Sequence, residues 1–331
     1  LVAGFFLGLA FSVRFQTLIF TGGIGLALLF ARNAKGMIST AIGFLISVVL
    51  VQGFIDFLVL RKPFAEFLEY VNYNLNHAYE YHTAPWYNYL FVLAGMLIPP
   101  VSLMLLFGYF KNWKKNFILF FPVLLFIVFH SAFPNKQERF ILPVVPLIIV
   151  LGLAGWQEFV AASSYWQRNK KLLLSMWVFF WAVNLVFLMA LTPMYSKKAR
   201  VESMSYLKNY PGLKYFTIED QGSHVLRFPP VYYSGQWPKY DAVFDTIDYQ
   251  NFAKEKDWNQ NEKQPGFVLF YQEKNLEVRI DSVKKYLPDL VFEARFKPGR
   301  MDRLIHLINP VNANETITLY RNTAVIPNKK P

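Results

Sequence analysis

The sequence predicts a multi-spanning α-helical membrane protein with a small soluble α/β domain at its C-terminal end. Hydrophobic residues make up 54% of the 331 residues and charged residues only 17%, whereas an ordinary soluble domain has about 25% charged residues. The charge is also unevenly distributed, because about 10% of residues 1–192 are charged but about 27% of residues 193–331. We therefore expect a transmembrane region over residues 1–192 and a soluble domain over residues 193–331.

Long apolar stretches predict the individual spans. A helix crosses a bilayer with roughly 17–25 residues, and five stretches have that length: residues 37–60, 88–110, 117–133, 141–160 and 172–192. Residues 15–31 form a shorter sixth stretch, and residues 1–12 have the composition of a seventh span whose start precedes Leu1. We expect six to seven spans, the first of them truncated, in a chain that lacks its natural N-terminus.

Basic residues predict the orientation of these spans. Lys and Arg are enriched in cytoplasmic loops, which places the opposite connections, residues 61–87 and 134–140, on the outer face. The soluble domain is then expected in the periplasm of a bacterial inner-membrane protein, or in the lumen of the endoplasmic reticulum if the source is eukaryotic. The connections predicted to be cytoplasmic carry eight basic residues and no acidic one: Arg32, Lys35, Lys111, Lys114, Lys115, Arg168, Lys170 and Lys171.

The outer connection has a pattern of its own. Over residues 64–80 apolar side chains recur at helical spacing, with acidic and amide side chains on the opposite face. This pattern predicts an amphipathic helix. The helix is expected either in the outer membrane interface or packed on the spans without a separate role.

The soluble domain alternates short apolar runs with helical segments. The helices are expected at residues 201–208 and 281–286, and Pro-Gly and Pro-Pro pairs separate several runs. The last two apolar runs predict a closing hairpin. The expected strands are residues 215–218, 242–247, 267–271, 290–296, 304–308 and 316–320.

Several classes of protein are excluded. The chain has no cysteine, which excludes disulfides, thiol catalysis and Cys-ligated metals. Its net charge of +12 is spread over loops without a dense basic stripe, which argues against nucleic-acid binding. No glycine-rich phosphate loop or metal-ligand spacing is found. We therefore expect no metal and no cofactor.

A polar segment between two apolar spans is the main candidate site. It runs from His130 to Pro143 at the expected outer face. Lys136 and Arg139 are predicted to bind a phosphate, Arg139 through a bidentate fork and Lys136 as a point charge. Glu138 is expected to orient Arg139 or bind a sugar hydroxyl. The alternative is an ordinary interfacial loop with snorkelling basic side chains.

Two further charges lie close to apolar spans at the same face. Arg14 interrupts the first two apolar runs, and a charge so near the hydrocarbon usually has a partner or a function; the alternative is simple snorkelling. Asp56 is expected to pair with Arg61 or Lys62, or to shape a polar cavity. Three histidines are expected near this surface in hydrogen-bonding roles: His77, His82 and His130.

The segment Asn135-Lys-Gln-Glu-Arg-Phe-Ile-Leu-Pro-Val-Val-Pro146 resembles the outer-loop signature of the Alg9-like mannosyltransferases, glycosyltransferase family 22. That signature reads His-Lys-Glu-x-Arg-Phe, followed by an apolar span with prolines. Asn135 stands where the family has His, and Gln137 where it has Glu, which suggests a divergent, bacterial branch. Three residues match the signature: Lys136, Arg139 and Phe140.

A second similarity comes earlier in the chain. In the family a span ends in Asp, an outer segment ends in Tyr-Asn, and Pro-Trp-x-x-Tyr opens the next span. Asp56, Tyr73-Asn74 and Pro85-Trp-Tyr-Asn-Tyr89 have this order here. The resemblance covers residues 1–192 and suggests supporting outer-face roles for these residues: Asp56, Tyr73, Asn74, His82 and Trp86.

The resemblance implies a GT-C fold and an inverting glycosyltransferase. It implies a polyprenyl-phosphate sugar donor, typically of mannose, and an acceptor glycan or lipid at the outer or lumenal face. A carboxylate in the first outer loop acts as general base in such enzymes, and that loop is expected before Leu1, so no catalytic residue is named. Donor binding is expected from seven residues: Arg14, His130, Asn135, Lys136, Gln137, Glu138 and Arg139.

The sequence leaves two alternative functions open. One is another GT-C transferase of the protein O-mannosyl or aminoarabinose type, which also joins many spans to an outer soluble domain. The other is a non-enzymatic transporter or flippase. Transporters often show duplicated halves and ionisable residues at the middle of the membrane, and this sequence shows neither.

Overall fold

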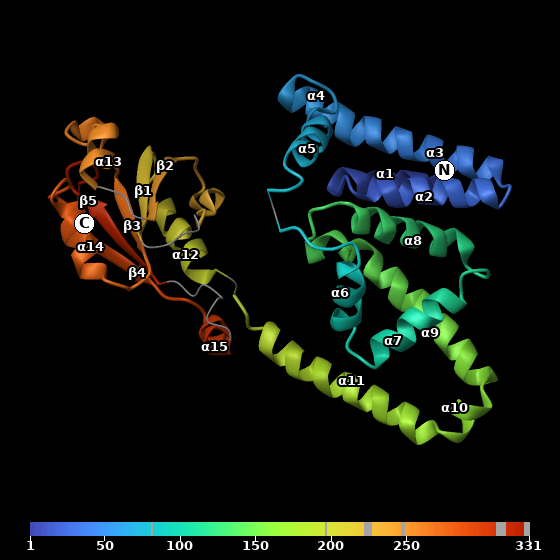
Figure 1. The fold of residues 1–331 in the computed structure, drawn as a ribbon. Helices are drawn as coiled ribbons and strands as arrows, with labels where there is room; N and C mark the ends of the chain where they lie inside the picture. Colours follow the sequence, from blue (N-terminus) through green and yellow to red (C-terminus); the bar gives the residue numbers. More distant parts are fainter. Residues whose placement is uncertain (81, 196, 222–226, 246–248, 309–315, 328–331) are drawn as a thin grey trace. The chain divides into compact units, whose positions relative to one another are not determined.

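The computed structural model describes residues 1–80, 82–195, 197–221, 227–245, 249–308 and 316–327 (Figure 1). The chain divides into two compact units, Leu1–Asn184 and Leu185–Pro331. The first is helical and the second contains a sheet, each with a hydrophobic core of its own. The chain is therefore mostly helical, with several apolar helices and a small sheet, as the sequence predicts.

The first unit consists of apolar helices joined by short connections. A π-helical turn, Val49–Gly53, joins α3 to α4, and α11 continues into the second unit. The helices are α1 (Val2–Val13), α2 (Thr17–Phe30), α3 (Ala34–Val48), α4 (Phe54–Leu60), α5 (Ala65–Asn76), α6 (Asn88–Met96), α7 (Val101–Lys111), α8 (Phe117–Ala132), α9 (Val145–Ala162), α10 (Ser164–Arg168) and α11 (Lys170–Leu191).

Three helical segments are long and apolar enough to cross a membrane by length and composition: Ala34–Leu60, Leu142–Ala162 and Lys170–Leu191. The expected span at residues 88–110 is not one continuous helix, because α6 and α7 meet at an angle of 117°. Pro99 and Pro100 lie at this break. Two successive prolines lack the N–H groups that a helix requires and clash with the preceding turn, which explains the difference from the expected straight span.

Small residues allow the helices to approach closely. In the contact between α7 and α9, a Cβ atom added at Gly108 would lie 2.0 Å from the carbonyl oxygen of Gly152, and one added at Gly155 would lie 2.0 Å from that of Gly108. Gly4 in α1 is equally close to the backbone of Thr40 in α3. Such glycines are typical of helix contacts inside membranes, where packing replaces the hydrophobic effect.

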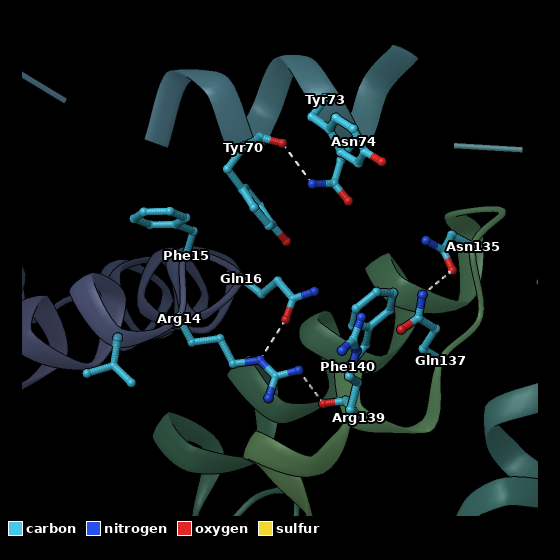
Figure 2. A pocket seen from close by; sticks show the side chains of 11 residues that line it. Arg14, Phe15, Gln16, Tyr70, Tyr73, Asn74, Asn135, Gln137, Arg139 and Phe140 are labelled. Atoms are coloured by element: carbon cyan, nitrogen blue, oxygen red, sulfur yellow. Dashed lines mark hydrogen bonds between the residues drawn. The ribbon is translucent and has the colours of Figure 1, made fainter. Parts of the chain in front are cut away.

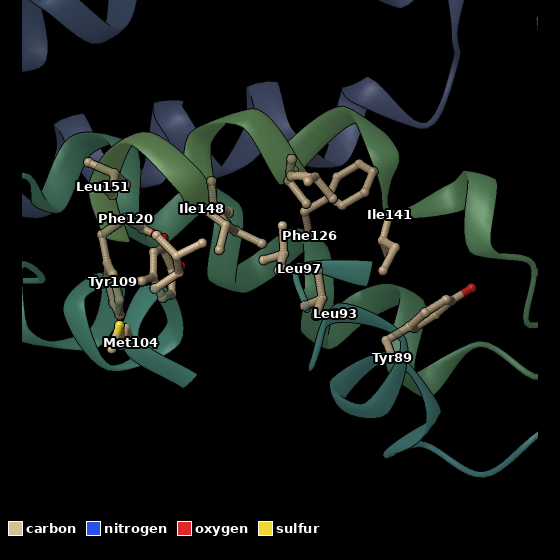
Figure 3. Packing of buried hydrophobic residues seen from close by; sticks show 14 of the residues in the cluster. Tyr89, Leu93, Leu97, Met104, Tyr109, Phe120, Phe126, Ile141, Ile148 and Leu151 are labelled. Carbon is tan, nitrogen blue, oxygen red and sulfur yellow. The ribbon is translucent and has the colours of Figure 1, made fainter. Parts of the chain in front are cut away.

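The hydrophobic core of the first unit lies between α6, α7, α8 and α9 (Figure 3). The end of this core next to the polar segment is formed by Tyr89 and Ile141, both fully buried. The hydroxyl of Tyr89 donates a hydrogen bond of 3.2 Å to the carbonyl oxygen of Gln137. The core therefore contacts the polar segment at residues 133–140 directly, through the hydroxyl of Tyr89.

The second unit is built on a mixed five-stranded sheet in the order β2-β1-β3-β5-β4. β1 pairs in parallel with β2 and β3, whereas β5 is antiparallel to both β3 and β4. The elements are β1 (Tyr215–Gln221), β2 (Lys239–Asp245), β3 (Phe267–Tyr271), β4 (Leu290–Phe296), β5 (Ile317–Asn322), α12 (Lys198–Tyr206), α13 (Tyr249–Glu255), α14 (Leu276–Lys284) and α15 (Arg300–Ile308).

Both faces of the central strand are covered. Phe267, Leu269 and Tyr271 of β3 pack in one core cluster together with residues of α12. Val268 and Phe270 pack in the other cluster with residues of α13 and α14. Alternate residues of a strand point to opposite faces, so all five residues of β3 are buried.

The predicted closing hairpin is wrong. Residues 304–308, expected as a strand, belong to helix α15. β5 lies instead between β3 and β4. Arg300, Arg303, Leu304 and Leu307 recur at helical spacing, and a short apolar run alone does not distinguish a strand from a helix. The expected connection at residues 309–314 lies outside the described residues.

We predict that Gly155→Ala lowers the melting temperature of the detergent-solubilised protein, with a destabilisation of about 1–3 kcal/mol typical of overpacking. The new methyl group would meet backbone atoms of Gly108, which cannot rotate away. Gly25→Ala in α2 is the matched control, because no atom lies within 4 Å of its added Cβ. Equal melting temperatures of the two variants would contradict close packing of α7 on α9.

Candidate functional site

A pocket of about 590 Å³ lies in the first unit. Three segments far apart in sequence form it: the link between α1 and α2, helix α5, and residues 135–140 (Figure 2). Among the described residues that line it, none is acidic. They are Val13, Arg14, Phe15, Gln16, Tyr70, Tyr73, Asn74, Asn135, Gln137, Arg139 and Phe140.

Arg14 connects two of these segments. Its Nε donates a hydrogen bond of 2.8 Å to Oε1 of Gln16, and its Nη2 donates to the carbonyl oxygen of Arg139. Burial lowers the pKa of Arg14, the phenol of Tyr70 raises it, and the charge of Arg139 lowers it further. An arginine keeps its charge despite such effects, so two positive groups repel each other at one side of the pocket.

No carboxylate among the described residues neutralises the positive charge of this pocket. Over the part of the chain that the structure describes, neither Arg14 nor Arg139 forms an ion pair with a carboxylate. Glu138 is exposed and does not line the pocket, so the expected ion pair that would orient Arg139 is not formed. Two adjacent guanidinium groups without a counter-charge favour an anionic ligand.

Helix α5 contributes the opposite side of the pocket. Tyr70, Tyr73 and Asn74 project from one helical face, and Nδ2 of Asn74 donates a hydrogen bond of 2.7 Å to the carbonyl oxygen of Tyr70. The ring of Tyr70 packs 5.2 Å from that of Phe15. Burial raises the pKa of Tyr70, while a hydrogen bond with Gln16 and the charge of Arg14 lower it. The amphipathic helix predicted for this region is confirmed as a helix.

Asp56 positions the start of α5. Its side chain is only 2% exposed and accepts two hydrogen bonds of 3.0 Å from Nε2 of Gln52. It also accepts a bond of 3.1 Å from the backbone N–H of Glu66, in the first turn of α5. A carboxylate stabilises this end of a helix. The expected ion pair with Arg61 or Lys62 is not formed by these described residues.

The side chain of Lys136 lies outside the pocket. It is 3% exposed, and its ammonium donates hydrogen bonds to three backbone carbonyls near the end of α8, those of His130 (3.1 Å), Ser131 (2.9 Å) and Phe133. Burial lowers its pKa. Helices end with unpaired carbonyls, so Lys136 closes the end of α8. This arrangement makes it a support for the neighbouring segment.

The backbone of the same segment is held from a second side. The N–H of Lys136 donates a hydrogen bond of 2.9 Å to the carbonyl oxygen of His82, and Thr83 forms an antiparallel bridge with Asn135. Nε2 of Gln137 donates to Oδ1 of Asn135 at 3.3 Å. His82 therefore contributes through its backbone, and its side chain is exposed.

The structure thus separates the predicted site residues into two groups. Arg14, Tyr73, Asn74 and three residues of the polar segment line the pocket, whereas His130 is buried with its Nδ1 2.8 Å from the carbonyl oxygen of Phe126. Trp86 is 67% exposed. The predicted residues that do not line the pocket are Asp56, His82, Trp86, His130, Lys136 and Glu138.

Two polar residues of the pocket, Gln16 and Tyr70, were not predicted as site residues. Gln16 accepts a hydrogen bond from Arg14 and lines the pocket together with Tyr70 of α5. The signal available for Gln16 is its polarity two residues after Arg14, between apolar spans. Tyr70 carries no such signal, because it fits the pattern of an amphipathic helix. Within the described ranges no cluster of three or more His, Cys, Asp or Glu residues suited to a metal ion occurs.

We predict that Lys136→Met lowers the melting temperature, with a destabilisation of about 1–3 kcal/mol, because the backbone carbonyls that Lys136 binds lose their donor. Thermal unfolding in detergent measures this effect. Lys115→Met is a suitable control, since this lysine is exposed and its partner Glu158 is exposed as well. A Lys136→Met variant with the same melting temperature as the wild type would show that the ammonium does not stabilise this segment.

Comparison with known proteins identifies the family of the chain. The family model of the Alg9-like mannosyltransferase family matches residues 2–237. Residues of the chain are 29% identical over 159 residues to GPI mannosyltransferase 3 of Saccharomyces cerevisiae, which covers 45% of this chain and 25% of that protein. GPI mannosyltransferase 3 of Candida albicans is 28% identical over 115 residues, 34% of this chain and 23% of that protein.

The matched part of the chain therefore corresponds to about a quarter of each of these curated relatives. No solved structure matches the chain. The family match extends over more than two thirds of the 331 residues and includes every segment that lines the pocket. The chain belongs to the Alg9-like mannosyltransferase family.

Proposed function

We propose that this chain binds the donor of an inverting mannosyl transfer, in which the sugar moves from a polyprenyl phosphate to an acceptor glycan or lipid. One observation carries the proposal. Arg14 and Arg139, 125 residues apart in sequence, meet at a pocket whose lining contains no acidic residue. Membership of a mannosyltransferase family supports this reaction over a transporter or flippase.

The charges fit the leaving group of such a reaction. The acceptor hydroxyl oxygen forms a bond to the anomeric carbon, and the bond from that carbon to the phosphate oxygen breaks. The phosphate keeps the electron pair, so its negative charge grows in the transition state. Guanidinium groups held near that oxygen stabilise the growing charge, and the acceptor proton passes to a carboxylate base. We assign that base to none of the described residues.

The remaining lining fits a sugar. Gln16, Asn74, Asn135 and Gln137 bring four amide groups to the pocket, and each amide can both donate and accept hydrogen bonds. Sugar hydroxyls need both kinds of partner. The absence of a metal-ligand cluster in the described residues leaves arginine as the group that can hold the phosphate in this proposal.

We place this site at the outer or lumenal face. The eight basic residues of the opposite loops favour the cytoplasm. Arg14 follows one predicted span and Arg139 precedes another, each at the end of its span opposite to those loops. A bacterial inner membrane with a periplasmic second unit is the preferred location, and the membrane of the endoplasmic reticulum is the alternative.

We predict that Arg139→Ala and Arg14→Ala each lower kcat/KM for a polyprenyl-phosphate mannose donor by about ten- to hundredfold, the value of a lost charge-assisted hydrogen bond. The assay uses membranes that contain the full-length protein. Arg139→Lys should retain part of the activity, because it keeps the charge but not the bidentate geometry. Thermal unfolding of each variant verifies that the fold is intact.

Arg168→Ala is the matched control, because this arginine lies beyond α9 in α10, outside the pocket. It should leave kcat/KM unchanged. Transfer rates of Arg139→Ala and Arg14→Ala equal to the wild type, in folded protein, would overturn the role of this pocket in donor binding.

The proposed orientation predicts the result of cysteine labelling. These 331 residues contain no cysteine, so single substitutions within them report one position each. In sealed membranes a maleimide that cannot cross the bilayer should label Lys274→Cys from the outer or lumenal side. Lys35→Cys should react only after the membrane is opened. The reverse pattern would show that the second unit faces the cytoplasm.

A further inference from the structure

Helix α15 of the second unit exposes a face that is both apolar and basic. Arg300, Arg303, Leu304 and Leu307 are all exposed and follow each other at i, i+3, i+4 and i+7, so they lie on one side of the helix. Leu304 is 48% and Leu307 78% exposed. Such a combination is unusual for a surface in water but typical of helices that lie in a membrane interface.

The acidic residue of α15 is turned away from this face. Asp302 is only 8% exposed, and its Oδ2 accepts a hydrogen bond of 3.2 Å from the backbone N–H of Gly299, just before the helix. This hydrogen bond caps the N-terminus of α15, as the acidic residue of a capping box does. The exposed face therefore carries positive charge without a neighbouring carboxylate of its own helix.

The start of α15 lies next to the chain where it leaves helix α11. A Cβ atom added at Gly299 would be 3.6 Å from the carbonyl oxygen of Tyr195. Tyr195 is four residues beyond Leu191, the last residue of α11. Four residues reach at most about 14 Å. The first turn of α15 is thus held close to the end of α11.

Helix α11 has the properties of a lipid-covered span. It has 22 residues, and none of its apolar window is buried by the described protein. A helix of that length covers the hydrocarbon core of a bilayer, about 30 Å. The headgroup region outside that core is only several ångströms deep. A helix tethered within a few residues of Leu191 therefore begins within reach of the bilayer surface.

We propose that α15 is an interfacial membrane helix that anchors the second unit to the lipid surface. Leu304 and Leu307 enter the boundary between acyl chains and headgroups, and Arg300 and Arg303 contact lipid phosphates. Anionic lipids strengthen the second contact. Tyr195, whose backbone lies beside Gly299 and which is 45% exposed, is an aromatic residue of the kind enriched at this depth. The anchor gives the sheet domain a second attachment besides α11.

Fluorescence quenching in vesicles tests this anchor. The full chain with Leu307→Cys carries a nitrobenzoxadiazole label and is reconstituted in phosphatidylcholine with phosphatidylglycerol, with or without nitroxide-labelled lipid. The label at position 307 should emit at shorter wavelength and be quenched several-fold more strongly than one at Val278→Cys. Val278 in α14 is the matched control, because it is apolar and 67% exposed.

Two results would overturn the proposal. Equal quenching at positions 307 and 278 would show that α15 has no special contact with lipid. A blue-shifted label at 307 that nitroxide lipid does not quench would show that protein covers this face. Labelling at Leu304→Cys repeats the measurement on the same face, and Arg300→Gln with Arg303→Gln should reduce quenching at 307 only in vesicles that contain phosphatidylglycerol.

Discussion

The pocket depends on the hydrogen bonds of one buried group, the ammonium of Lys136. It donates to carbonyls at the end of α8, and the chain from Asn135 to Phe140 continues from that point. The backbone contact with His82 and the hydroxyl of Tyr89 hold the same segment from two other sides. Arg139 is thereby presented at a defined place, and its carbonyl oxygen is available to Arg14.

On the other side of the pocket, too, a buried charged residue holds a neighbouring element in place. Asp56 is buried against the first turn of α5, and that helix carries Tyr70 and Asn74 to the pocket. The charged residues in and around the pocket thus differ in their partners. Lys136 donates to backbone carbonyls, and Asp56 accepts from Gln52 and from the backbone of Glu66, so both support other elements. Arg14 and Arg139 line the pocket and carry charge that no described carboxylate neutralises. Uncompensated charge at a pocket is the physical basis for proposing an anionic ligand there.

Much of the site could be predicted from the sequence because its residues are conspicuous in their surroundings. Arg14 interrupts two apolar runs, and Arg139 lies in a short polar segment between spans. Their meeting could not be derived, because it depends on contacts 125 residues apart. The sequence predicts that Lys136 binds a phosphate because of its residue type alone. A lysine that binds phosphate and one that closes a helix have the same sequence pattern. Only the positions of the carbonyls distinguish them.

The sequence by itself determined the membrane character of the first unit and the ordinary composition of the second, because apolar length and charge density are local properties. Two successive prolines, a local signal, account for the bend between α6 and α7, whereas tertiary structure decided the place of β5 between β3 and β4. It also decided which basic side chains bind backbone carbonyls as Lys136 does and which line the pocket without a described carboxylate partner. These outcomes depend on hydrogen-bond partners that are distant in sequence, so a reading of local pattern does not contain them.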